Sequence, residues 1–151
     1  MSTLESRIQS LIQSQALLTA AVTKLQLPDL VPLPAPASTA PDGFCQRDAQ
    51  GKLHVVVYNQ GVGAASDSTT RVVFGCADPA QCSAPTTVDM STAALATPGS
   101  SVDLVFDFPA GCFDPFTAKC SFEIGVDVGN TVQESSEINN TAAGVCGPQI
   151  F

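Results

Sequence analysis

Hydrophobic and polar residues alternate along much of the chain in the two-residue rhythm of β-strands. Residues 53–58, 102–108 and 122–128 carry apolar side chains at every second position. Because neighbouring side chains of a strand point to opposite faces, these runs predict strands with one buried face. Apolar runs at residues 71–74, 88–90 and 141–145 predict further short strands, with Gly, Pro and Asn turns between them. The pattern predicts an all-β, antiparallel β-sandwich of about seven strands.

The N-terminal segment has a different period. Residues 3–25 contain no Gly, Pro or Cys, and apolar positions recur at spacings of four and three, which predicts a helix with a heptad seam. The seam consists of Leu4, Ile8, Leu11, Gln15, Leu18, Val22 and Leu25. We expect residues 1–27 to be a coiled-coil oligomerisation or anchoring segment. Ile12 and Ala21 widen the apolar face, which favours a homotrimer over a dimer.

Two alternatives for this helix stay open. It can fold back onto its own domain, or it can dock into a different protein of a larger assembly. Residues 28–41 read PDLVPLPAPASTAP, a composition that predicts an extended Pro-rich linker holding the helix away from the domain. The domain itself is then expected over residues 42–151.

Charge and length exclude several kinds of partner. The 151-residue chain has a net charge of −8 and only six Lys and Arg residues, so we expect no nucleic-acid partner and no attraction to an anionic membrane. The apolar stretch Ala16 to Val22 is too short to span a bilayer, which predicts no membrane insertion. The first residues, MSTLESR, show no signal peptide.

The cysteines predict a disulfide framework. The chain has six, at positions Cys45, Cys76, Cys82, Cys112, Cys120 and Cys146, and their spacings do not match a zinc site. Six cysteines allow 15 pairings; proximity favours Cys76 with Cys82 and Cys112 with Cys120, which leaves Cys45 with Cys146. Disulfides need an oxidising environment. A virion protein, made in the cytoplasm and oxidised after lysis, reconciles them with the missing signal peptide.

Four motifs resemble the CARDB family of bacterial cell-adhesion-related domains. They are Pro28-Asp29-Leu30, Asn59-Gln60-Gly61, Pro98-Gly99, and Asp127 followed by Glu134-Ser135-Ser136-Glu137-Ile138-Asn139-Asn140. Ser136 replaces the usual Asn. The resemblance implies an Ig-like antiparallel β-sandwich, used for adhesion or as a spacer in surface and extracellular proteins. Whether the opening Pro-Asp-Leu pairs in a sheet or belongs to the linker stays open.

Catalytic signatures are missing from the sequence. His54 is the only histidine and lies in a predicted strand, and there is no phosphate-binding glycine loop or dinucleotide motif. We therefore expect no enzyme activity, no cofactor and no resident metal. The alternative to the last expectation is calcium, because oxygen-bearing side chains gather in one short span. These are Asp127, Asn130, Glu134, Glu137 and Asn139.

Two functions are consistent with these features. The first is a trimeric, virion-associated fibre or decoration protein of a bacteriophage, a structural part that self-associates or docks through its helix. The second is a bacterial adhesion module, on a cell surface or secreted, that binds a host carbohydrate or protein. The chain has no Trp and one Tyr, which argues against a lectin. Both hypotheses predict protein partners and an extracellular or virion-surface location. Phe113 and Phe116 are the best contact candidates, unless they fold back onto the sandwich.

Overall fold

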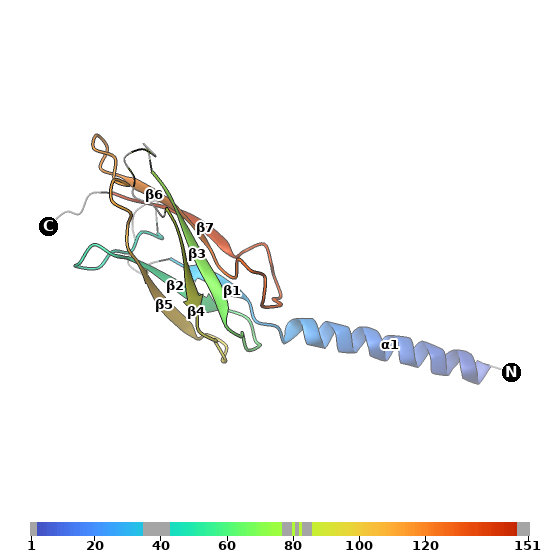
Figure 1. Cartoon of the computed structure of the whole chain (residues 1–151). Helices are drawn as coiled ribbons and strands as arrows, with labels where there is room; N and C mark the ends of the chain where they lie inside the picture. The colour runs from blue at the N-terminus through green and yellow to red at the C-terminus, as the bar shows by residue number, and fades with distance from the viewer. Residues whose placement is uncertain (1–2, 35–42, 77–79, 81, 83–85, 148–151) are drawn as a thin grey trace.

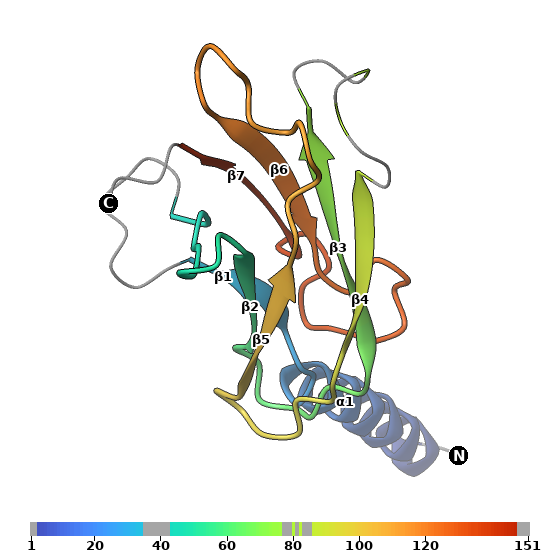
Figure 2. The same cartoon turned by 60° about the vertical axis from the view of Figure 1, so that its left-hand side comes forward.

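A computed structural model describes residues 3–34, 43–76, 80, 82 and 86–147, with side chains of residues 19–25 outside the description. One helix precedes seven strands (Figures 1 and 2). The elements are α1 (Thr3–Leu25), β1 (Leu30–Leu33), β2 (Leu53–Asn59), β3 (Ser68–Gly75), β4 (Thr87–Thr92), β5 (Ser101–Phe106), β6 (Cys120–Gly125) and β7 (Thr141–Cys146). The expected helix and all-β domain are confirmed.

The strands form two antiparallel sheets that face each other. One sheet has the order β1-β2-β5 and the other β4-β3-β6-β7. Alternation within the strands decides which side chains lie between the sheets: in β2, Leu53, Val55 and Val57 are buried while the residues between them are half-exposed. Phe106 and Phe122 are the largest side chains that are fully enclosed. The hydrophobic effect of burying these two inner faces against each other is the main source of stability.

The segment expected to be a linker contains the first strand. Leu30–Leu33 pairs antiparallel with β2, with Leu30 opposite Asn59, and Leu30 is only 1% exposed. The assignment of residues 28–33 to a linker, and of the domain start to residue 42, is therefore wrong. Pro32 does not prevent pairing because β1 lies at the edge of its sheet. The remainder of that segment, residues 35–41, lies outside the described residues.

Helix α1 joins the sandwich directly, so the expected spacer between them is also wrong. The turn after the helix packs on the loop that follows β2, where the Gly63 amide donates to the Leu27 carbonyl oxygen at 3.2 Å. A Cβ at Gly63 would stand 1.8 Å from the Gln26 carbonyl oxygen. The approach of these two backbones thus requires glycine.

The helix projects away from the sandwich (Figure 1). Its seam residues Leu4, Leu11 and Leu18 are 70%, 70% and 66% exposed, so the alternative in which the helix folds back onto its domain is wrong. The side chains of Val22 and Leu25 lie outside the description. Within the part of the chain described, no helix is long and apolar enough to cross a membrane.

Asn59, the last residue of β2, is fully buried and fully hydrogen-bonded. Its Oδ1 accepts from the backbone amides of Asp29 and Gly61, both at 3.1 Å. Its Nδ2 donates to the carbonyl oxygens of Gly63 at 2.8 Å and Leu95 at 3.2 Å. One side chain therefore ties together the chain entry, the loop after β2 and the segment between β4 and β5.

We expect Asn59→Ala to lower the free energy of unfolding by about 3 kcal/mol or more, because four side-chain hydrogen bonds to the backbone are lost at once, among them the acceptor of the buried Asp29 amide. Urea unfolding monitored by circular dichroism would measure it. Gln133→Ala is the control: Gln133 is exposed, and its loss should change stability by less than about 0.5 kcal/mol. Equal effects of the two substitutions would contradict the role of Asn59.

Candidate functional site

The turn between β6 and β7 is closed by one buried carboxylate. Asp127 is 4% exposed and has a backbone φ of 50°, in the left-handed region. Its Oδ1 accepts from the backbone amide and the hydroxyl of Thr131, both at 3.0 Å, and its Oδ2 accepts from the Val132 amide at 3.0 Å. These bonds compensate the unfavourable backbone conformation and give the start of the turn a defined shape.

Glu134 connects this turn to the point where the chain enters the sandwich. The residue is 6% exposed; its Oε1 accepts from the Leu30 amide at 2.5 Å and its Oε2 from the Asn140 side-chain amide at 2.7 Å. Burial raises the pKa of Glu134 to about 7, against the opposing effect of these two hydrogen bonds. The nearby carboxylates of Glu137 and Asp127 add smaller contributions in the same direction.

Asp29 makes the second connection between the same two segments. The Asn139 side-chain amide donates to both of its carboxylate oxygens, at 3.0 and 3.1 Å, and the Gln60 side-chain amide donates to Oδ2 at 2.7 Å. A backbone bond from Ser135 to Pro28, at 3.0 Å, lies alongside. We call Asp29, Asn59, Glu134, Asn139 and Asn140 the entry clamp.

The entry clamp explains why three of the sequence motifs occur together. Pro-Asp-Leu, Asn-Gln-Gly and the Glu-Ser-Ser-Glu-Ile-Asn-Asn segment are up to 110 residues apart, yet they meet through side-chain hydrogen bonds. Asp29 and Asn59 are not among the predicted site residues, because neither belongs to a catalytic or metal-ligand pattern of the sequence. The motif pattern was the one signal that could have identified them.

Three carboxylates of this region lie close enough to share a cation. Oxygen atoms of Asp127, Glu134 and Glu137, here called the acidic triad, all lie within 4.8 Å of one another. Glu137 Oε1 also accepts from the Glu134 amide at 2.9 Å. Two further oxygens, Oδ1 of Asn139 and Oδ1 of Asn140, are buried without a hydrogen-bond partner. Hard oxygen donors of this kind suit calcium.

The structure brings together only part of the expected calcium set. Asp127, Glu134 and Glu137 converge, whereas the Asn139 amide group is turned toward Asp29. Asn130 is exposed, and its backbone amide donates to the Asp127 carbonyl oxygen at 2.9 Å. The two asparagines serve the shape of the turn and the entry clamp.

The opposite end of the sandwich is held by disulfides. Cys45 bonds Cys146, Cys76 bonds Cys82, and Cys112 bonds Cys120. Cys120 and Cys146 face each other across β6 and β7, and Gly75, just before Cys76, pairs with Ser121. All three disulfides thus lie at one end of the sandwich. Figure 1 shows α1 projecting from the other end.

The Cys112–Cys120 loop, here called the tip loop, presents one phenylalanine and retains another. Phe113 packs on Phe108, with ring centroids 5.0 Å apart, and under the Arg47 guanidinium at 4.6 Å. Phe116 is 96% exposed. Asp114 Oδ1 accepts from the amides of Phe116 at 2.7 Å and Thr117 at 2.9 Å. These bonds within the turn fix the backbone that carries Phe116.

The single histidine of the chain lies between two acidic side chains. Both ring nitrogens of His54 contact carboxylates, those of Asp103 and Asp48, and all six cysteines are in disulfides. The histidine is therefore not paired with a serine or cysteine nucleophile.

Comparison with solved structures identifies two similar folds. The first is the CARDB domain of a Pyrococcus furiosus protein, solved in complex with di-metal ions, at 21% identity and a TM-score of 0.53; the match covers 81% of this chain and 94% of that one. The second, a domain of a Methanosarcina acetivorans protein named "putative cell surface protein", has 20% identity, a TM-score of 0.55 and coverage of 83% and 95%.

Comparison with curated proteins gives no match. The comparison with family models does: residues 27–144 match the CARDB model, a range that begins at the turn after α1 and includes β1. This range agrees with the pairing of β1 with β2. The match to a family of adhesion-related domains favours the adhesion-module hypothesis over the virion fibre. The chain therefore belongs to the CARDB family.

Proposed function

We propose that this chain is a non-catalytic adhesion module displayed outside the cell, held by α1 and making contact through the tip loop. The observation that carries the proposal is the placement of two exposed apolar features at opposite ends of one rigid sandwich. Of the two structural relatives, one is named as a cell surface protein and neither as a virion component. A family of adhesion-related domains supports the same choice.

The tip loop suits a protein partner. Phe116 is almost wholly exposed, and the disulfide together with the Asp114 bonds restricts the loop before any partner binds. Preorganisation of this kind lowers the entropy cost of binding, and a buried aromatic side chain is a common hot spot of protein interfaces. The partner is then a protein with an apolar pocket that accepts a phenyl ring.

The exposed seam of α1 suits self-association. A row of leucines with Ile8 between them, about 46–70% exposed, gains burial if copies pack side by side. Ile12, next to this row, is 54% exposed. It widens the apolar face, which favours a coiled coil of three helices. Three copies would present three tip loops in parallel and raise the avidity of a weak contact.

A second candidate function is calcium binding by the acidic triad. Three carboxylates lie together, two of them buried, and an isolated buried charge is costly unless a cation or hydrogen bonds compensate it. The buried Oδ1 of Asn140 lacks a partner, while Nδ2 of the same amide lies 2.7 Å from Glu134. Rotation of that amide would supply a fourth oxygen ligand. A structural relative contains di-metal ions, which supports the same proposal.

For the tip loop, we expect Phe116→Ser to reduce binding of the fluorescent full-length protein to intact cells by about tenfold or more, since a buried aromatic contact is lost. A panel of bacterial and animal cells should be used, with flow cytometry as the readout. Ile138→Ser is the matched control: Ile138 is 94% exposed in the turn between β6 and β7, at the helix end. Equal loss of binding in both variants would refute the tip contact.

For the helix, we expect the full-length protein to have three times the monomer mass in multi-angle light scattering. The double substitution Leu11→Lys and Leu18→Lys should convert it to a monomer, because two charges then fall in each seam. Ser10→Lys with Gln13→Lys adds the same charges off the seam and should leave the mass unchanged. A monomeric wild type would reject self-association and favour docking to another protein.

For the acidic triad, we expect calcium titrated into protein that was first freed of metal with a chelator to give binding heat in calorimetry. Excess calcium should also raise the thermal unfolding midpoint. Saturation at about 100 times Kd corresponds to about 2.7 kcal/mol of stabilisation. Glu137→Gln should weaken binding, because one ligand charge is lost, whereas Glu123→Gln on the exposed face of β6 should not. If calcium produces neither heat nor stabilisation, the acidic triad is only part of the fold.

A further inference from the structure

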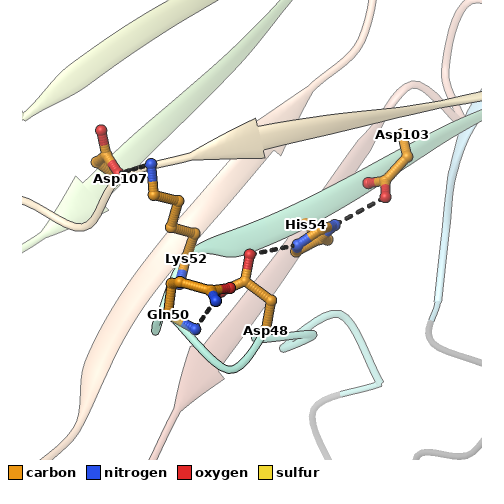
Figure 3. Close-up of polar contacts among 6 residues, drawn as sticks. All are labelled: Asp48, Gln50, Lys52, His54, Asp103 and Asp107. Carbon is orange, nitrogen blue, oxygen red and sulfur yellow. Dashed lines mark hydrogen bonds and ion pairs between the residues drawn. The ribbon is translucent and has the colours of Figure 1, made fainter.

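His54 lies between two carboxylates that come from different parts of the chain (Figure 3). Its Nδ1 is 2.7 Å from Oδ2 of Asp103, on β5. Its Nε2 is 2.8 Å from Oδ2 of Asp48, in the turn before β2. The imidazole thus bridges the outer face of the three-stranded sheet and the turn that lies over it.

This geometry requires a charged histidine. A neutral imidazole carries one N–H, and its other nitrogen is an acceptor, whereas an ionised carboxylate only accepts. A neutral His54 would set a lone pair against one of the two carboxylates at hydrogen-bond distance. Only the imidazolium donates to both Asp48 and Asp103.

The surrounding charges act in the same direction. The hydrogen bond to Asp103, and then that to Asp48, raise the pKa of His54 above its ordinary value, and partial burial opposes them. Other charged groups nearby are Lys52 and Asp107, whose Nζ and Oδ1 lie 3.2 Å apart at an exposed position, and Arg47 of the same turn, which pairs with Leu53. β1, on the other side of β2, has the sequence LVPL and contributes no charge.

The turn held by His54 reaches the base of the tip loop. Asp48 also shapes the turn, since its Oδ1 accepts from the amides of Gln50 at 2.9 Å and Lys52 at 3.0 Å. The neighbouring Arg47 guanidinium lies 5.3 Å from the Phe108 ring centroid and 4.6 Å from that of Phe113. Movement of the turn would therefore loosen the packing of Arg47 over Phe113.

We propose that His54 is a pH-sensitive clip: its imidazolium fastens the turn at residues 46–52 to β5 and braces the base of the tip loop, and its deprotonation loosens the turn, which keeps its backbone bonds to β2. The clip rests on the contacts of the turn, so it holds whatever the tip loop binds. It adds to the proposed function a control of the loop by proton concentration.

The direction in which pH acts on the clip follows from the pKa shifts of His54 and Asp48. The pKa of His54 is raised in the folded protein, so its stabilising contribution is complete below the unfolded value of about 6.5 and is lost as pH rises through the folded value. The pKa of Asp48 is lowered, chiefly by the hydrogen bond from His54, so its contribution is lost only in acid. The clip is closed between these limits and opens on the alkaline side.

Nuclear magnetic resonance of the full-length protein tests the proposal, because His54 is the only histidine and its ring signals are unambiguous. We expect the titration midpoint of the His54 ring signals to lie at a higher pH than that of a histidine in an unfolded peptide. Asp103→Asn should lower the midpoint, since one acceptor charge is removed. Asp107→Asn is the matched control: Asp107 pairs with Lys52 and not with His54, so the midpoint should shift much less.

Loosening of the turn has its own readout. The amide signals of residues 46–48 and the ring signals of Phe113 should change with the His54 midpoint, and His54→Gln should abolish these changes. Glu134 titrates at the other end of the sandwich and is followed separately at the amides of Leu30 and Asn140. A His54 midpoint at or below the peptide value, no effect of Asp103→Asn, or turn amides that ignore the midpoint would each overturn the clip.

Discussion

The fold depends on how the chain enters the sandwich without leaving buried polar groups unpaired. Residues 28–30 pass between the end of β2 and the turn after β6, where Asp29 and Leu30 are almost fully buried. Two backbone amides there have no strand partner, and side chains provide the acceptors: Asn59 for Asp29 and Glu134 for Leu30. A buried amide without an acceptor would cost a few kcal/mol, so these side chains determine whether β1 can pair at all.

The same constraint gives the family motif its physical meaning. The acid- and amide-rich segment before β7 resembles a metal loop in composition, yet its side chains form hydrogen bonds both within the turn and to the chain entry. Asp127 closes its own turn, and Glu134 and Asn139 reach across to the entry. The motif is therefore mainly a set of hydrogen bonds that selects one arrangement of β1, β2 and β7, and any cation would add to that arrangement.

The two ends of the sandwich are stabilised by different chemistry. Hydrogen bonds and close glycine contacts hold the end from which α1 projects, whereas three disulfides hold the end with the tip loop. Disulfides restrict the unfolded chain and need no core, which suits loops that are exposed on most sides. The buried core between the two sheets fixes how the helix end and the tip loop are placed relative to each other.

Much of this protein was determined by the sequence alone. Periodicity of 3.5 residues in Thr3–Leu25 and of two residues in β2, β5 and β6 identified the helix and the main strands, because burial of one face is a local property of each element. Tertiary structure alone decided that β1 is a strand despite Pro32, that α1 meets the sandwich without a spacer, and that Phe113 is covered while Phe116 is not. It also decided that His54 lies between Asp48 and Asp103. Each of these depends on contacts between residues distant in the chain, which no local pattern encodes.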